Sequence, residues 1–158
     1  MKRTKYPASS GASYRMRKIS LFDLVRALKE FFGGEFASRV NLSLPSRPSG
    51  VLCADCEALA YFIKRFLCEL CTDTPLSVTV EATATEVRVH FSAGESCREL
   101  LSINPDIMML AKQSGFYTTY SERGVILYAR LESESLYFLH AIDSYDFFKV
   151  LQRAFADE

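Results

Sequence analysis

The stretch that decides the fold reads VLCADCEALAYFIKRFLCELCTD and runs from Val51 to Asp73. Its apolar residues recur at intervals of three and four, the spacing that places them on one face of an α-helix. The residues of this stripe are Leu59, Phe62, Ile63, Phe66, Leu67 and Leu70. Asp55 precedes the stripe, where its carboxylate can accept hydrogen bonds from the first free N–H groups of a helix. The sequence therefore predicts a buried helix whose opposite face, carrying Arg65 and Glu69, is left for other contacts.

Four of the five cysteines, Cys53, Cys56, Cys68 and Cys71, fall in this stretch. Their spacing, C-x2-C-x11-C-x2-C, is similar to that of a four-thiolate zinc site. If the segment is one continuous helix, the first and third thiols are about 22 Å apart at 1.5 Å per residue, too far for one zinc ion. We expect free thiols that pack as small apolar groups and no metal site, with zinc binding through these four residues as the weaker alternative. An odd number of cysteines and no signal-peptide pattern are typical of the cytoplasm.

The length and composition are those of one globular domain. The chain has 158 residues, of which 49% are hydrophobic and 24% are charged, enough to build a sizeable core. The net charge is zero, so no overall positive field attracts nucleic acid. No apolar run approaches the roughly 20 residues that span a bilayer. We therefore expect neither a nucleic-acid partner nor a membrane span.

Basic residues are concentrated before the first acidic residue, Asp23. They are Lys2, Arg3, Lys5, Arg15, Arg17 and Lys18. Such a polar segment, which also contains several serines and a glycine, cannot build a core. We expect residues 1–19 to be a flexible basic tail and residues 20–158 to form a single domain.

The domain is expected to begin with an amphipathic helix at residues 20–33. Ser20 is a suitable N-cap with Asp23 three residues later, and two glycines follow the last apolar residue. We interpret this helix as a possible dimerisation segment. Phe31 and Phe32, at its end, are the residues expected to contact a protein partner or a second copy of the chain.

The remaining pattern alternates strands with helices. The expected strands are residues 39–44, 76–82, 86–91, 116–120, 125–131 and 136–142. A helix should begin at Asn104–Pro105, and another, capped by Asp143 or Ser144, should end the chain. This order predicts an α+β fold, a two-layer sandwich of a mixed or antiparallel sheet with helices mainly on one face.

Three strings resemble the ATP-binding domain of histidine kinases and their relatives, the Bergerat-fold ATPase superfamily. They are VNLSLPSRPSGVLCADCEALAYFIKRFLCEL (40–70), LSVTVEATATEVRVHFSAG (76–94) and LAKQSGFYTTYSERGVILYARL (110–131). The resemblance covers residues 40–131 and leaves 132–158 as an extra strand and helix. It implies a Bergerat-like fold and a nucleotide site beside the first helix.

The chain departs from this family at the residues that would hold the nucleotide. Glu69 stands where the family has a Mg²⁺-binding asparagine, with Arg65 one turn earlier. Ser92 replaces the family's adenine-binding aspartate, and Gly94 is the remaining glycine of that motif. The phosphate-covering lid is reduced to CRELLSI (97–103), which lacks glycine. If a nucleotide binds after all, Arg65, Glu69, Ser92 and Gly94 are the residues expected to form its site.

No other catalytic motif is present in the sequence: there is no P-loop, GxGxxG, HExxH or GxSxG. The two histidines, His90 and His140, fall in expected strands and match no kinase histidine. The interpretation is a non-catalytic, degenerate histidine-kinase-like ATPase domain that acts as a protein-interaction or regulatory module in bacterial signalling. It implies a protein partner or homodimer, no cofactor and no small-molecule ligand. The alternatives are a nucleotide-binding ATPase or kinase-like enzyme with an altered site and, third, a zinc-binding protein.

Overall fold

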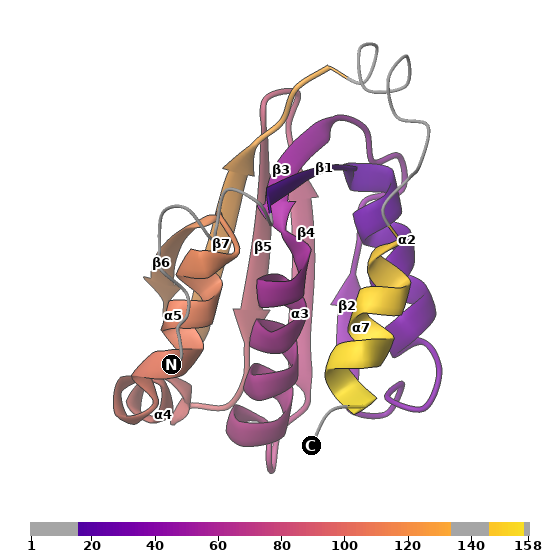
Figure 1. Cartoon of the computed structure of the whole chain (residues 1–158). Coiled ribbons are helices and arrows are strands. Elements are labelled where there is room, and N and C mark those ends of the chain that lie inside the picture. Colours follow the sequence, from indigo (N-terminus) through magenta and orange to yellow (C-terminus); the bar gives the residue numbers. More distant parts are fainter. Residues whose placement is uncertain (1–15, 134–145, 157–158) are drawn as a thin grey trace.

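The computed structural model describes residues 16–133 and 146–156, which Figure 1 draws in colour. One layer is a five-stranded sheet in the order β2–β4–β5–β7–β6, with β2 parallel to β4 and the other neighbours antiparallel. Its strands are β2 (Val40–Ser43), β4 (Leu76–Ala82), β5 (Glu86–Ser92), β6 (Tyr117–Ser121) and β7 (Gly124–Arg130). The second layer contains α2 (Leu21–Phe32), α3 (Cys56–Arg65), α5 (Pro105–Gln113) and α7 (Phe147–Ala156), all on one face of the sheet (Figure 1). The predicted two-layer α+β sandwich is confirmed.

The central helix α3 joins the two layers. The Asp55 carboxylate caps it by accepting a hydrogen bond from the Ala58 N–H at 3.1 Å. The whole predicted stripe is buried, and Phe62 meets Phe91 of β5 edge-to-face with ring centroids 5.0 Å apart. The helix continues as a π-helical turn, η1 (Phe66–Leu70), before the chain turns toward β4. The apolar stripe of the helix thus packs in the core, and the residues between these positions form its exposed face.

The first residues of the stretch form a strand and not the start of the helix. β3 (Val51–Asp55) pairs antiparallel with β1 (Met16–Ser20) in a separate two-stranded sheet. The helix thus starts after Asp55, as the predicted N-cap requires, but the strand at Val51–Asp55 was not predicted, because backbone pairing with a distant segment determines this conformation. β1 also begins inside residues 16–19, which were expected to belong to the tail, and its Ile19 is fully buried. Residues 1–15 lie outside the described residues.

The first helix, the two hairpins and the terminal helix follow the sequence pattern. In α2 the Ser20 hydroxyl accepts a hydrogen bond from the Asp23 N–H at 3.0 Å, as its N-cap role predicts. Both predicted hairpins are present, β4–β5 and β6–β7. The sequence pattern did not assign α4 (Cys97–Ile103). The terminal helix α7 is present, whereas the strand expected at residues 136–142 and the caps Asp143 and Ser144 lie outside the described residues.

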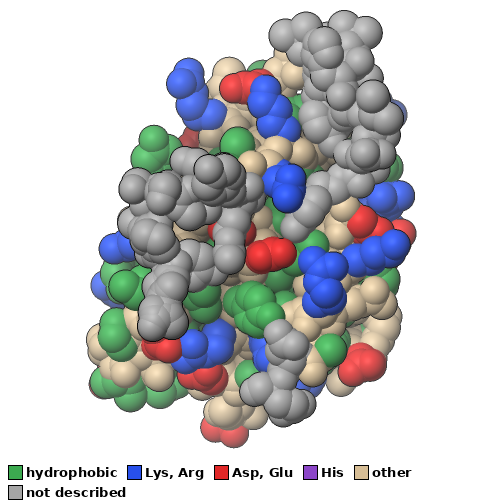
Figure 2. All heavy atoms as spheres, in the orientation of Figure 1, with side chains coloured by type: hydrophobic (Ala, Val, Ile, Leu, Met, Phe, Trp, Pro, Cys, Tyr) green, Lys and Arg blue, Asp and Glu red, His purple; other side chains and the backbone are tan. Residues whose placement is uncertain are grey.

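The helical face carries both signs of charge. Figure 2 shows Lys and Arg side chains interspersed with Asp and Glu side chains, with hydrophobic groups between them. This mixture agrees with the zero net charge of the sequence. Among the described residues, no helix is long and apolar enough to cross a membrane.

Candidate functional site

Arg65 connects two helices on the exposed side of the central helix. Its Nη2 donates to Glu69 Oε1 at 3.1 Å, its Nε also donates to Oε2 of the same carboxylate, and its Nη1 lies 2.8 Å from Asp106 Oδ2. Glu69 belongs to the π-helical turn and Asp106 to the first turn of α5. We call Arg65, Glu69 and Asp106 the Arg65 network. It includes two of the residues that the family resemblance assigns to a nucleotide site, Arg65 and Glu69.

The hydrogen bonds of this network shift the pKa values of Arg65 and Asp106 in opposite directions. The hydrogen bond to Glu69 raises the pKa of Arg65, helped by Asp106 and opposed by desolvation. In return, the hydrogen bond from Arg65 lowers the pKa of Asp106. Both oxygens of the Glu69 carboxylate accept hydrogen bonds from one guanidinium, the bidentate geometry that arginine and carboxylate favour. A Mg²⁺ ion at Glu69 would compete with this guanidinium for the carboxylate oxygens.

Ser92 and Gly94 lie where β5 ends and the chain turns toward α4. Ser92 is the last residue of β5 and pairs in register with Ser77 and Gly124. A Cβ placed on Gly94 would lie 2.9 Å from the Thr74 hydroxyl oxygen, closer than real Cβ contacts allow. A side chain at this position would therefore require the Thr74 side chain to move. The close approach of the turn before β4 accounts for a glycine here without a ligand.

The segment that the family resemblance interprets as a shortened lid, CRELLSI, forms the short helix α4. It begins three residues after Gly94, whose carbonyl accepts a hydrogen bond from the Cys97 N–H at 3.1 Å. Cys97 and Leu101 are each 1% exposed, so this helix contributes to the core. In Figure 1 it lies at the lower end of α5. The segment is thus held by buried side chains.

The structure brings some of the expected nucleotide residues together and leaves others apart. Arg65 and Glu69 are bonded to each other, but no hydrogen bond or ion pair between described residues joins either of them to Ser92 or Gly94. Asp106 was missed by sequence reasoning. The only signal was its place after the Pro105 that starts a helix, and this does not indicate which side chain it meets.

His90, on β5, is paired with a side chain of the neighbouring strand. Its Nε2 lies 3.0 Å from Glu81 Oε1 on the neighbouring strand β4. The ring is about one third exposed, on a strand as the alternating pattern predicted. This cross-strand pair has no nucleophile or base hydrogen-bonded to it among the described residues.

The four cysteines do not form a site. Cys53 is exposed on β3, Cys56 is buried at the start of α3, and Cys68 and Cys71 belong to or follow the π-helical turn. Burial raises the pKa of Cys56 to about 12 and that of Cys71 to about 12, so both remain protonated near neutral pH. Within residues 16–133 and 146–156, no group of three or more His, Cys, Asp or Glu side chains could hold a metal ion.

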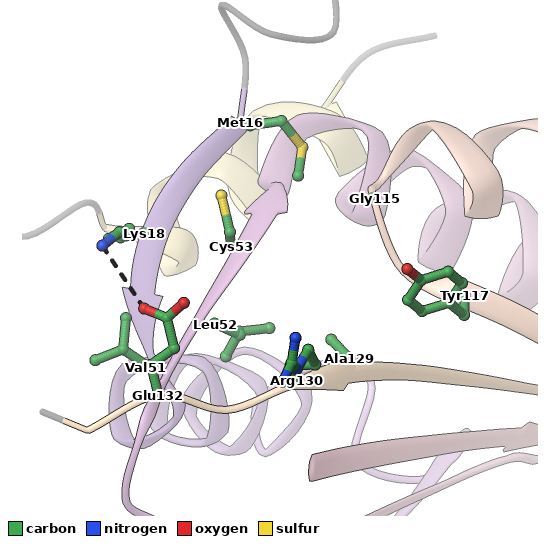
Figure 3. Close-up of a pocket in the computed structure, with 10 residues that line it drawn as sticks. All are labelled: Met16, Lys18, Val51, Leu52, Cys53, Gly115, Tyr117, Ala129, Arg130 and Glu132. Carbon is green, nitrogen blue, oxygen red and sulfur yellow. Dashed lines mark ion pairs between the residues drawn. The ribbon is translucent and has the colours of Figure 1, made fainter. Parts of the chain in front are cut away.

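Cys53 instead lines a small hollow of about 220 Å³ between the two-stranded sheet and the β6–β7 hairpin (Figure 3). An ion pair between Lys18 of β1 and Glu132 crosses part of this hollow at 3.7 Å. Desolvation raises the pKa of the Cys53 thiol although Lys18 acts in the opposite direction. A thiol with a raised pKa is a poor nucleophile at neutral pH. The hollow therefore has no activated group for covalent chemistry in Cys53.

Phe31 and Phe32 do not form an open contact surface. Phe32 is only 1% exposed, and Phe31 packs against Phe155 and Phe36 with ring centroids 4.9 and 5.5 Å away. The expectation that both rings face a partner is wrong for Phe32, because α7 folds back against α2 and covers it. Among the described residues, the exposed large apolar side chain of α2 is Phe22, at 52%. The helical period alone could not distinguish these positions.

Comparison with known proteins gives similarity only at the level of structure. No family model and no curated protein matches the chain. Similar solved structures include the catalytic domain of histidine kinase ThkA, with 14% identity over 75% of this chain and 96% of that one and a TM-score of 0.45. The ATP binding domain of PrrB from Mycobacterium tuberculosis is 13% identical over 77% of this chain and 99% of that one, with a TM-score of 0.44. Histidine kinase AdeS of Acinetobacter baumannii is 11% identical over 76% of this chain and 68% of that one, with a TM-score of 0.43. These values describe a resemblance to histidine kinase ATP-binding domains and do not establish membership of the family.

Proposed function

We propose that this chain is a histidine-kinase-like ATPase domain that no longer binds nucleotide and acts as a protein-interaction or regulatory module. The observation that carries this proposal is the Arg65 network. Its cation is used by two carboxylates of the same chain, one of which is the residue matched to the family's Mg²⁺ ligand. Two of the four residues expected to hold a nucleotide, Arg65 and Glu69, are thus bonded to each other.

The free-energy cost of rearranging the Arg65 network and α4 to admit a nucleotide supports the same proposal. Mg²⁺ and a triphosphate at this face would compete with the bonds that Arg65 makes to Glu69 and Asp106. The segment that would cover the phosphates is α4, and its two buried side chains would have to leave the core before its backbone could move. Each change opposes binding, because partly buried polar groups lose their partners and apolar surface meets water.

The alternative function is a nucleotide-binding enzyme whose altered site uses Arg65, Glu69, Ser92 and Gly94. In that case the Arg65 guanidinium would exchange its carboxylate partners for phosphate oxygens. Titration with ATP and ADP in the presence of Mg²⁺, read by calorimetry and thermal unfolding, separates the two functions. A ligand with Kd near 100 µM stabilises the fold by about 1.4 kcal/mol at about 1 mM.

We expect no heat of binding and no stabilisation. The variant Arg65→Ala tests where any response originates. Arg153→Ala is its matched control, because Arg153 is also a helical arginine whose ion pair joins two helices, in this case α7 to Glu57 in the first turn of α3. Saturable stabilisation of the wild type that is lost in Arg65→Ala and kept in Arg153→Ala would overturn the proposal in favour of the enzyme.

A further inference from the structure

A groove runs between the outer side of α2 and the chain that leaves β2. It encloses about 630 Å³. It is lined by Phe22, Val25, Arg26, Lys29, Leu42, Leu44, Pro45, Ser46 and Pro48. We call it the α2–β2 groove. It lies apart from the Arg65 network, since none of its lining residues belongs to α3, η1 or α5.

The groove has an apolar floor with one exposed aromatic ring. Val25 is 6% exposed, and Leu42 and Leu44 are partly buried against the core. Phe22 is 52% exposed, although a phenylalanine of this kind is usually covered. The opposite wall contains Pro45 and Pro48, whose fixed backbone φ angles restrict the loop and lower the entropic cost of binding. Such a surface can accept apolar side chains of a partner.

The rim of the groove is basic. Arg26 and Lys29 line it, and the exposed Arg47 lies in the loop between two lining residues. Arg26 is partly neutralised by Asp23, 3.5 Å away, and its guanidinium lies 5.9 Å from the Phe22 ring centroid. Lys29 and Arg47 form no ion pair with any residue in the described ranges. An apolar floor with unneutralised cations at its rim is complementary to a partner with apolar and acidic residues.

A second hollow at the end of the same helix has the opposite charge. It is lined by Glu30, Phe31, Gly34, Glu35, Phe36, Phe148, Gln152, Phe155 and Ala156. Its phenylalanine rings pack on one another with centroids 4.9 to 6.0 Å apart. Its exposed charges are the carboxylates of Glu30 and Glu35. One helix thus carries a basic groove and an acidic hollow, and this contrast provides an internal control for charge.

The lining residues of α2 indicate a helical occupant. Phe22, Val25 or Arg26, and Lys29 are three or four residues apart, so they form one ridge over two turns, about 10 Å long. Ridges of this kind pack against a second helix, and an amphipathic helix in a groove is a common mode of peptide recognition. A partner helix would place its apolar residues on Phe22 and the floor, and its carboxylates beside Arg26 and Lys29.

We propose that the α2–β2 groove binds an acidic amphipathic helix of a partner protein. This inference rests on the proposed function, because it assigns the surface through which the interaction module works. The floor provides apolar burial, and the cations select acidic partners and orient them.

The probe for this proposal is a synthetic, fluorescein-labelled helical peptide of about 16 residues with leucines along one face and glutamates on both sides of them. A second peptide replaces every glutamate by lysine. Fluorescence anisotropy with the full chain should give saturable binding of the acidic peptide that weakens as salt increases, and no saturable binding of the basic one.

Two variants test the groove itself. Lys29→Glu should weaken binding of the acidic peptide by about tenfold or more, and Phe22→Ser should do the same. Lys112→Glu is the matched control, because Lys112 is an exposed lysine in the last turn of α5 just as Lys29 is in the last turn of α2. It should bind like the wild type. Circular dichroism checks that each variant is folded, and both groove positions are exposed.

Three results would overturn the proposal. They are no saturable binding of the acidic peptide, equal binding of the basic peptide, or the same effect from Lys29→Glu as from Lys112→Glu. Sedimentation equilibrium tests another occupant: a wild-type dimer that dissociates in Phe22→Ser would show that a second copy occupies the groove. The nucleotide titration fails or succeeds independently, because it reports on Arg65, whereas the peptide reports on α2.

Discussion

Two regions of the helical layer differ in how their charged residues are used. At the Arg65 network, the cation of α3 is paired with two carboxylates, and α4 buries its side chains next to the π-helical turn. At the α2–β2 groove, an aromatic ring is half exposed and Lys29 has no ion pair among the described residues. A residue paired within the chain must break existing bonds to bind a ligand, whereas an unpaired one at an apolar groove does not. The side chains that can bind a partner without breaking existing bonds are therefore those of α2 and not those of the Arg65 network.

The largest expected effect is a loss of stability in the region of the Arg65 network. Phe66→Ala removes a ring that is 0% exposed and packs against Phe62 and Phe91 beneath the Arg65 network. We expect it to lower the free energy of unfolding by about 3 to 5 kcal/mol, because it loses buried area and leaves a cavity. Urea denaturation measures this loss. Phe22→Ala, at the open groove, is the control and should cost less than about 1 kcal/mol, and equal losses would contradict the difference in burial.

The next effect compares the helix caps of the two regions. Asp55→Ala removes the cap of α3, whose carboxylate is 2% exposed, and should destabilise the protein by about 1 to 2 kcal/mol. Ser20→Ala removes the corresponding cap of α2 and should cost about 0.5 to 1 kcal/mol, because a neutral hydroxyl is a weaker hydrogen-bond acceptor than a carboxylate. Thermal unfolding of both variants is the measurement. A larger loss for Ser20→Ala would reverse this order.

A smaller effect is the pH dependence of the stability that the Arg65 network contributes. The pKa of Asp106 is lower in the folded chain than its ordinary value because Arg65 donates a hydrogen bond to it. The pair therefore stabilises the fold above the unfolded pKa of about 3.9, and this contribution is lost as pH falls through the lowered folded pKa. Since the Asp106 side chain is 58% exposed, we expect Asp106→Asn to cost less than about 1 kcal/mol at neutral pH.

This difference from the wild type should disappear in acid, where the wild-type carboxyl is also protonated. Unfolding curves at several pH values measure it. Asp23→Asn, which removes the negative charge beside Arg26, serves as a comparison from the α2–β2 groove region. A loss that persists unchanged at low pH would show that the network does not act through the charge of Asp106.

The smallest effect concerns stability at the open groove. Lys29→Ala should change the free energy of unfolding by no more than about 0.5 kcal/mol, because the side chain is exposed and pairs with no described residue. Its value as a test is that binding of the acidic peptide should weaken in the same variant. A marked loss of stability would indicate that Lys29 supports the fold and that its binding effect is indirect.

Local patterns predicted most of the elements but not their neighbours. The stripe from Leu59 to Leu70 predicted the central helix, and Ser20 and Asp55 predicted two caps, because these signals depend on residues a few positions apart. β3 was missed because Val51–Asp55 becomes a strand through pairing with Met16–Ser20, more than thirty residues earlier. Phe32 was assigned to an interface because nothing in α2 reveals that α7 covers it.

The candidate site divides in the same way. By itself, the sequence determined the two-layer fold and the buried stripe, because each depends on residue type and local spacing. Only the tertiary structure decided that Arg65 meets Asp106 and that Lys29 and Phe22 border a groove, because these relations join segments far apart in the chain. A side chain's chemistry is set by its type, but whether it is available to a partner depends on what the fold places beside it.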